Sequence, residues 1–182
     1  MLGMVLLLGC VSTSLAAVGP ITFSEYPIGT VVDDEYASLG VLFAAGYAGN
    51  LPQIRMDGAM PGSPVVIGIP YGIGDFWMEF IQPVESVGFD CGYWDVVGSG
   101  VIELYAPDNS LITVASNSIT GPESVSYAGL GAIKKIRFDG SADPAGASLD
   151  NLTFTPVPEP GTLLLLSLGG TAVFASRRRR RK

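Results

Sequence analysis

The chain has 182 residues, of which 17 are acidic and 10 are basic, and its formal net charge is −7. It contains no histidine, which excludes a Ser-His-Asp triad, a Cys-His pair and a histidine-ligated zinc site. Six of the basic residues end the chain, so the remainder is too acidic to bind nucleic acid through phosphate contacts.

Residues 1–17 are expected to be a signal peptide. The apolar run Val5-Leu6-Leu7-Leu8 is followed by small-x-small cleavage sites that end at Ala16 and Ala17, so signal peptidase is an expected partner. No Lys or Arg precedes the run, so the N-terminal amine alone supplies the charge there or the true start lies upstream. Two alternatives are lipidation at Cys10, in a loose lipoprotein box, and a buried N-terminal strand or helix.

Residues 18–155 have the length of one domain. Without the chain ends, which hold Glu159 and the six terminal basic residues, 16 acidic and 4 basic residues remain, a net charge of −12. Such a charge suits an exported, soluble surface that attracts cations. Cys91 is then the only cysteine, which excludes an intramolecular disulfide, and its strand-like surroundings favour a small buried residue over a nucleophile.

Short apolar runs separated by Gly and Pro predict strands throughout this domain, and no long stretch has the period of a helix. Pro107-Asp108-Asn109 predicts a turn that joins two of the strands as a hairpin. Near the end, Ile136 and Phe138 are expected to face the core, with Lys135 and Arg137 outward. The pattern predicts an antiparallel sandwich or barrel. The expected strands are 21–23, 40–43, 65–69, 76–81, 84–90, 101–105, 111–114, 125–127, 133–139 and 149–154.

The last part of the chain, residues 156–182, has three pieces: a Pro-rich linker, an uncharged apolar segment at 161–176 and a basic end. As a helix the apolar segment is about 24 Å long. This is short for a hydrocarbon core of about 30 Å, but arginine side chains reach the interface and make spanning feasible. The basic end is expected to stay cytoplasmic, with the rest of the chain outside that membrane. The alternative is a buried helix followed by a nucleic-acid-binding tail.

Pro158-Glu159-Pro160, the apolar segment and the terminal arginine cluster together resemble the PEP-CTERM sorting signal of Gram-negative bacteria. The resemblance implies recognition by exosortase, a transpeptidase-like membrane protease. It also implies export across the inner membrane, transient anchoring, and delivery to the surface or to an exopolysaccharide or biofilm matrix. The tail is then a processing signal rather than part of the fold.

The domain before this tail resembles exported domains of the jelly-roll type, whose architecture is similar to that of carbohydrate-binding modules. The resemblance implies a β-sandwich rather than a particular function. It rests on Ile21-Thr22-Phe23-Ser24-Glu25, Pro27-Ile28-Gly29-Thr30, Tyr36 with Gly40-Val41-Leu42-Phe43, Val87-Gly88-Phe89-Asp90 and Leu149-Asp150-Asn151-Leu152-Thr153-Phe154.

Strand alternation places Glu25 with Ile21 and Phe23, and Asp150 with Leu152 and Phe154, on core-facing sides. If the first and last strands pair antiparallel, the two carboxylates meet at the rim, where they need a cation or a proton. Calcium is the expected ion, with further oxygens from residues nearby in the sequence. The alternatives are that the carboxylates turn to solvent or that one pairs with Lys134 or Lys135. The further ligands expected are Asp33, Asp34 and Asn151.

Four aromatic residues are candidates for sugar contacts: Tyr71, Trp77, Tyr93 and Trp94. The alternative for each of them is packing in the core. Phe76, Met78 and Phe80 alternate with Trp77, Glu79 and Ile81, so only one of these sets can face the core. Tyr93-Trp94 follows a glycine and is expected on a loop.

These observations lead to three hypotheses of function. The first is a non-enzymatic surface or matrix protein that contacts exopolysaccharide. The second is a calcium-dependent carbohydrate-binding module, and the third is a polysaccharide hydrolase, for which no carboxylate pair stands out. Gly72-Ile73-Gly74 lacks the third glycine and the helix of a dinucleotide loop, so no nucleotide cofactor is expected.

Overall fold

The computed structural model describes residues 16–46, 49–57, 60, 64–68, 74–144 and 146–158, except for the side chain of Tyr93. Most of the expected signal peptide and the sorting tail from residue 159 onward lie outside these ranges. In the described part of the chain, no helix is long and apolar enough to cross a membrane. The elements are β1 (Val18–Ile21), η1 (Ala37–Leu39), β2 (Val41–Ala45), β3 (Gln53–Arg55), β4 (Val65–Ile67), β5 (Phe76–Trp94), β6 (Val101–Tyr105), β7 (Leu111–Ser116), β8 (Gly121–Asp139) and β9 (Ser148–Pro156).

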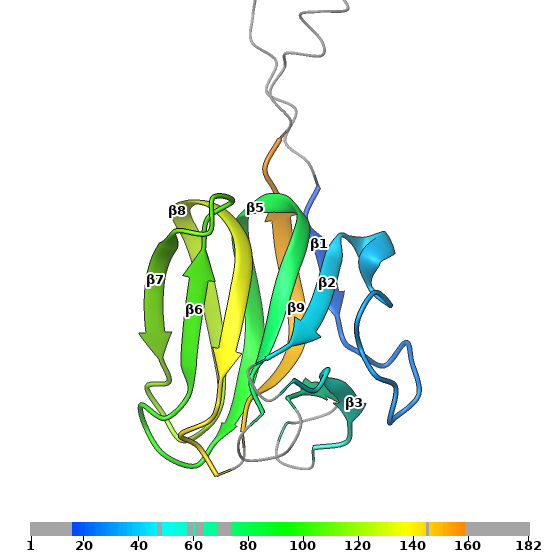
Figure 1. The fold of residues 1–182 in the computed structure, drawn as a ribbon, viewed down its shortest axis with the longest axis vertical. Helices are drawn as coiled ribbons and strands as arrows, with labels where there is room; N and C mark the ends of the chain where they lie inside the picture. The colour runs from blue at the N-terminus through cyan, green and yellow to red at the C-terminus, as the bar shows by residue number, and fades with distance from the viewer. Residues whose placement is uncertain are drawn as a thin grey trace, which may run out of the picture. The chain divides into compact units, whose positions relative to one another are not determined.

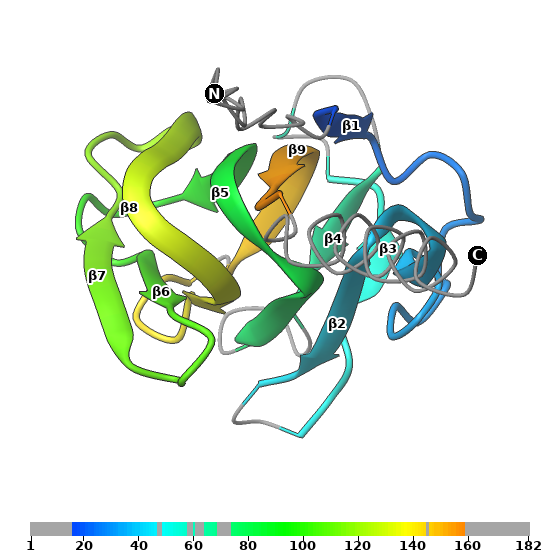
Figure 2. The same ribbon diagram turned by 90° about the horizontal axis from the view of Figure 1, so that it is seen from above.

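Two long strands, β5 and β8, bend and so take part in both layers of a sandwich (Figures 1 and 2). The register between them shifts around residues 80–83 of β5 and residues 129–132 of β8. Extra residues of this kind bend a strand sharply, and on β8 they include Gly129 and Gly131, both at positive φ. The bend therefore folds one continuous antiparallel sheet over on itself.

The front layer in Figure 1 consists of β2, the first half of β5, the second half of β8, β6 and β7, which pair in that order. The other layer consists of β3, β4, β9 and the remaining halves of β5 and β8, with β1 paired to β9. The fold expected from the sequence, an antiparallel β-sandwich, is confirmed.

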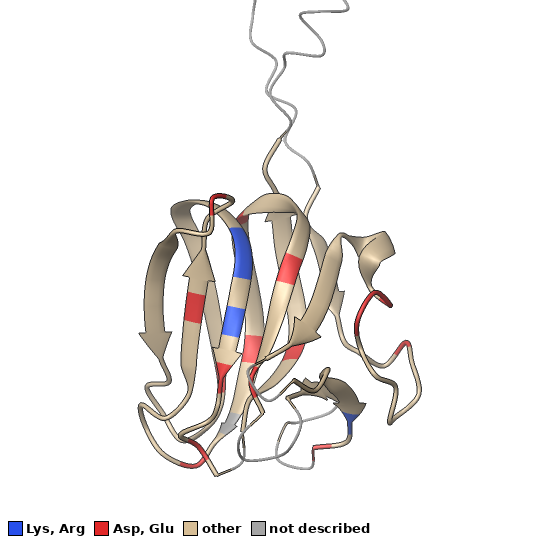
Figure 3. Cartoon of the chain, viewed as in Figure 1, with Lys and Arg blue, Asp and Glu red and all other residues tan. Residues whose placement is uncertain are grey.

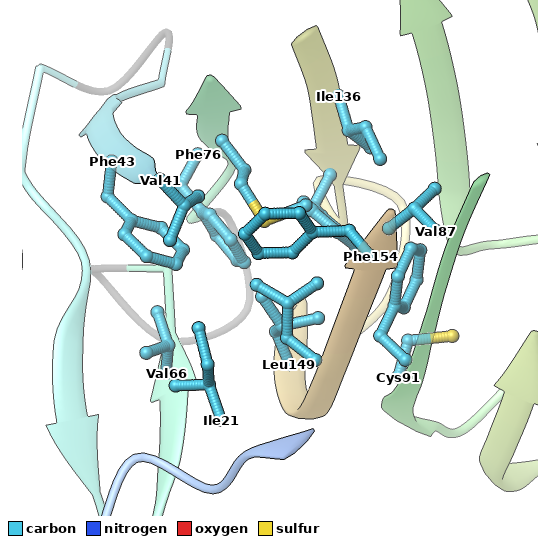
Figure 4. Packing of buried hydrophobic residues seen from close by; sticks show 14 of the residues in the cluster. Ile21, Val41, Phe43, Val66, Phe76, Val87, Cys91, Ile136, Leu149 and Phe154 are labelled. Atoms are coloured by element: carbon cyan, nitrogen blue, oxygen red, sulfur yellow. The ribbon is translucent and has the colours of Figure 1, made fainter. Parts of the chain in front are cut away.

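The core lies between the two layers, as Figure 4 shows for part of it. Phe43 and Phe76 from the front layer and Leu149 and Phe154 from the other layer belong to one buried cluster. Aromatic rings contact one another within it, for example Phe80 and Phe154, whose centroids lie 4.9 Å apart. Residues 16–157 form one compact unit with this core, so we expect them to fold on their own.

Several local predictions are confirmed. Strands β6 and β7 form the expected hairpin, and in its turn the Asp108 carboxylate accepts hydrogen bonds from the Ser110 N–H and hydroxyl. Ile136 and Phe138 are fully buried, as expected. The first and last strands, β1 and β9, pair antiparallel, which was the condition for the carboxylate site at the rim. The sequence did not predict β3, and it divided β5 and β8 at their bends because the glycines and Pro83 there interrupt the apolar pattern.

Candidate functional site

The outward face of the front layer carries two rows of side chains that run across the strands. Their neighbours along each strand, such as Phe76, Met78 and Phe138, are fully buried, so alternation directs the rows to solvent. The first row is Ala44, Trp77, Arg137, Glu103 and Val114, and the second is Leu42, Glu79, Lys135, Tyr105 and Leu111.

Two hollows open on this face, and Trp77 lines both of them. The larger, which we call the Trp77–Tyr105 groove, has a volume of about 310 Å³ and is lined by Ala44, Trp77, Glu79, Tyr105, Asn109 and Lys135. The second has a volume of about 290 Å³ and is lined by Ala45, Gly46, Asp75, Trp77 and Arg137. Asn109 reaches the groove from the β6–β7 turn, where it adopts a φ of 63°.

The aromatic rings of the groove come from two strands that are not neighbours. The centroids of the Trp77 and Tyr105 rings lie 5.4 Å apart with their planes tilted by 47°. The Tyr105 hydroxyl donates a hydrogen bond to Glu103 Oε2 at 2.8 Å. Burial and this hydrogen bond raise the pKa of Tyr105, so the phenol remains a neutral donor.

Arg137, in the first row, is held by three carboxylates. Its guanidinium contacts Asp75 at 2.9 Å, Asp139 at 3.1 Å and Glu103 at 3.3 Å. Burial alone would lower the pKa of Arg137, but the bonds to these carboxylates raise it. The Asp139 pKa is lowered, because hydrogen bonds from Ser141 and the charge of Arg137 outweigh burial. The Arg137 guanidinium carbon lies 6.0 Å from the centre of the Trp77 ring, at the edge of cation–π range.

The two lysines of β8 both pair with Glu79. Lys134 Nζ lies 3.3 Å and Lys135 Nζ 3.6 Å from its carboxylate oxygens. Lys134 also donates to the backbone carbonyls of Phe80 and Ile81. Figure 3 shows the basic segments of β8 between acidic segments of β5 and β6. Charges of opposite sign thus alternate across the face.

The four aromatic candidates have different outcomes. Trp77 lies at the groove, whereas Tyr71 and the Tyr93 side chain are outside the described residues. Trp94 is fully buried and ends β5, so the prediction that it lies on a loop and touches ligand is wrong. The strand continues two residues past Gly92, and Gly100 leaves room for the ring: a Cβ there would lie 2.5 Å from Trp94 atoms.

The predicted side-by-side placement of Glu25 and Asp150 on the core face is also wrong. Strand β1 ends at Ile21 and Phe23 has a φ of 57°, so alternation does not continue to Glu25. Glu25 is exposed and accepts a hydrogen bond from the Tyr36 hydroxyl at 3.3 Å. Asp33 and Asp34 are exposed as well.

Asp150 instead lies directly opposite Asp90 of β5. Between the pair Gly88–Thr153 and the pair Asp90–Asp150, strand β9 has two residues where β5 has one. One of these two residues, Asn151, has a φ of 50°. This bulge turns Asp150 to the face opposite Leu149 and Leu152, although Asp150 is still only 2 % exposed.

Asn151 joins the two carboxylates. Its Nδ2 donates to Asp90 at 2.8 Å and to Asp150 at 3.4 Å, and the Ser124 hydroxyl also donates to Asp90. In the described residues, no group of three or more His, Cys, Asp or Glu side chains is arranged to hold a metal ion. The calcium site therefore stays a prediction, now with Asp90 in place of Glu25 beside Asp150.

Cys91 is a core residue, as predicted. It is fully buried, and its Sγ lies 3.5 Å from the Glu123 carbonyl oxygen. Burial raises the pKa of the thiol to about 12, although the nearby Trp94 indole acts in the opposite sense. A neutral, inaccessible thiol is not a nucleophile.

Sequence reasoning missed Tyr105, Arg137 and Asn109 as members of the candidate site. The sequence did show that Arg137 faces outward and that Asn109 lies in the turn of a hairpin. What was missing was the strand order, since only the pairing of β8 with both β5 and β6 brings Trp77 and Tyr105 together.

The tail has a clear relative among protein families. Residues 156–181 match the model described as the PEP-CTERM protein-sorting motif, so the chain is an exported protein that carries a signal for exosortase-type processing. The motif directs such proteins toward the cell surface. A search of curated proteins found no match.

Solved structures similar to this chain share little sequence with it. The stig cyclase Fisc from Fischerella sp. TAU has a TM-score of 0.47 and 14% identity, covering 81% of this chain and 100% of that one. The arabinose-bound MgGH51 α-L-arabinofuranosidase has a TM-score of 0.44 and 13% identity; 80% of this chain corresponds to only 27% of that enzyme. CBM29_1, a family 29 carbohydrate binding module from Piromyces equi, has a TM-score of 0.40 and 8% identity over 65% of this chain and 81% of that one.

Proposed function

We propose that this protein is a non-enzymatic surface or matrix protein that binds polysaccharide through the Trp77–Tyr105 groove. The observation that carries the proposal is the pair of aromatic rings on the solvent side of the front layer, 5.4 Å apart and next to two hollows. Flat aromatic faces pack against the C–H faces of sugar rings, and polar groups beside them bind the hydroxyls. The Asn109 amide and the Glu79–Lys135 pair are such groups.

A binding role rather than catalysis is supported by the state of the acidic residues. Glycoside hydrolysis needs one carboxyl group that gives up a proton and a second that acts as base or nucleophile. Asp75, Glu79 and Glu103 each form an ion pair with Arg137 or a lysine of β8. Carboxylates in such ion pairs are suited to holding the Arg and Lys side chains in position rather than to transferring protons.

Affinity gel electrophoresis of residues 18–157 tests the proposal. Each gel contains one soluble polysaccharide, and retardation relative to a polysaccharide-free gel reports binding. We expect retardation in at least one gel and its loss in Trp77→Ala and Tyr105→Ala. Ile81→Ala is the matched control, because Ile81 is an exposed residue of the same strand outside the groove. Retardation that is equal in all four proteins contradicts the proposal.

A calcium-dependent version of this function is the second candidate. It is favoured by the opposed carboxylates of Asp90 and Asp150, one of them buried. Half a turn of the Asn151 amide would place its oxygen between them, and Ca²⁺ accepts such a mixture of oxygens. Retardation in the gels that disappears with EDTA and returns with Ca²⁺ would support this version; retardation unaffected by EDTA would exclude it.

A further inference from the structure

The cations at the groove are already neutralised by carboxylates of the protein. Apart from the basic chain end, the sequence has four basic residues, and three of them, Lys134, Lys135 and Arg137, lie on this part of β8. Both lysines pair with Glu79, and Arg137 pairs with Asp75, Glu103 and Asp139. No cation of this group is therefore left to attract an anionic ligand.

The balance of charge at the face is in fact negative. Four carboxylates, those of Asp75, Glu79, Glu103 and Asp139, face the three cations. The domain around them is acidic as well, with 16 acidic and 4 basic residues once Glu159 and the six terminal basic residues are set aside. An acidic polysaccharide would have to displace these internal carboxylates while being repelled at long range.

Resting on the proposed function, we propose that the Trp77–Tyr105 groove selects uncharged polysaccharides and rejects those that contain uronic acids or sulfate. An uncharged chain needs no counter-charge. Its ring faces pack on Trp77 and Tyr105, and its hydroxyls exchange hydrogen bonds with the Asn109 amide and with the ion pair of Glu79 and Lys135. Ion-paired groups serve this purpose well, because they present donors and acceptors at fixed positions.

The test compares two groups of polysaccharides in affinity gels with residues 18–157. The neutral group is hydroxyethylcellulose, glucomannan and galactomannan, and the acidic group is polygalacturonate and alginate. We expect binding to a neutral polymer that changes less than about twofold between 20 and 200 mM NaCl, because screening does not act on an uncharged ligand. Trp77→Ala should weaken it at least tenfold, and polygalacturonate should not bind.

A gain-of-binding variant tests the charge explanation itself. Glu79→Gln removes the partner shared by Lys134 and Lys135, so it should create salt-sensitive binding to polygalacturonate. Glu85→Gln is the matched control, since Glu85 is exposed beyond the bend of β5 and its loss changes the net charge equally. No gain in Glu79→Gln, or an equal gain in Glu85→Gln, overturns the explanation.

The outcomes separate this inference from the function on which it rests. If the wild-type domain binds polygalacturonate or alginate and loses that binding in Trp77→Ala, the groove binds polysaccharide but the inferred selectivity is wrong. If the domain binds neither group, the proposed function fails as well.

Discussion

Arg137 and Asp75 form an ion pair in which the guanidinium donates through both Nε and Nη2 to one carboxylate oxygen, at 3.1 and 2.9 Å. The Asp75 side chain is 3 % exposed, whereas the Asp139 side chain on the same guanidinium is 22 % exposed. The pair fixes Arg137 beside Trp77. Asp75, Trp77 and Arg137 line the second hollow, so a buried carboxylate holds the Arg137 side of that hollow in place.

Removal of Asp75 should therefore be costly for the fold. We expect Asp75→Ala to lower the free energy of unfolding by about 3 kcal/mol, because it leaves a partly buried cation short of its main partner. Asp139→Ala is the control and should cost about 1 kcal/mol or less, since its carboxylate is reached by solvent. Urea unfolding of both variants measures the difference, and equal losses would contradict this role of Asp75.

Calcium should stabilise the domain if the pair of Asp90 and Asp150 holds an ion. Ca²⁺ at 100 times its dissociation constant adds about 2.7 kcal/mol, which raises the melting temperature of a domain of this size by about 5–10 °C. We expect the melting temperature in millimolar Ca²⁺ to exceed that in EDTA by this amount in the wild type and in Glu25→Ala. In Asp150→Asn we expect no difference between the two conditions. A wild-type melting temperature that is the same in EDTA and in millimolar Ca²⁺ would contradict a calcium site at this pair.

Gly100 should not tolerate a side chain. A Cβ at this position would meet three atoms of the Trp94 ring at 2.5 Å, and the ring is enclosed by the core. We predict that Gly100→Ala lowers the free energy of unfolding by about 2 kcal/mol, as overpacking does. In a Trp94→Leu background the same change should cost far less. A cost that is independent of the residue at position 94 would rule out this contact as its cause.

The domain should lose stability at alkaline pH. Burial raises the pKa of Cys91 from 9.0 and that of Tyr127 from 10.0, each to about 12, and the pKa of Tyr36 is raised as well. The unfolded chain releases these protons at lower pH than the folded one. These groups therefore make their full contribution to the free energy of unfolding below pH 9. That contribution is lost as the pH rises toward 12, and each group accounts for a loss of up to about 1.4 kcal/mol per pH unit.

Urea midpoints at pH 8, 9 and 10 measure this effect. Between pH 9 and 10 the pH is above the unfolded-state pKa of Cys91 but still below that of the two tyrosines. Cys91→Val should therefore have a flatter pH dependence there than the wild type. Identical slopes would mean that the thiol titrates alike in the folded and unfolded protein.

The parts of the fold that could be predicted depend on local rules. Period-two alternation fixed which side of residues 133–139 faces the core, and turn chemistry at Asp108 and Asn109 fixed the hairpin of β6 and β7. Such patterns need only the residues of one strand or one turn. Alternation also separated Phe76, Met78 and Phe80 from Trp77, Glu79 and Ile81. It did not show which of these two sets faces the core.

The parts that could not be predicted depend on contacts between distant segments. A single extra residue in β9 moved Asp150 to the other face, and β5 alone does not reveal that its partner is bulged. Trp94 became a core residue because Gly100, on the following loop, leaves it space. The groove itself exists only because β8 lies between β5 and β6, a strand order that short, similar strands do not encode locally.

The central claim is that polysaccharide lies on Trp77, and tryptophan fluorescence tests it most directly. The chain has two tryptophans, and Trp94 is fully buried, so quenching by iodide reports on Trp77. The experiment titrates residues 18–157 with the polysaccharide that retards them most strongly, and compares iodide quenching with and without it. We predict that bound polysaccharide protects Trp77 from quenching and shifts its emission to the blue. Unchanged quenching at a concentration that saturates binding would place the ligand elsewhere and contradict the claim.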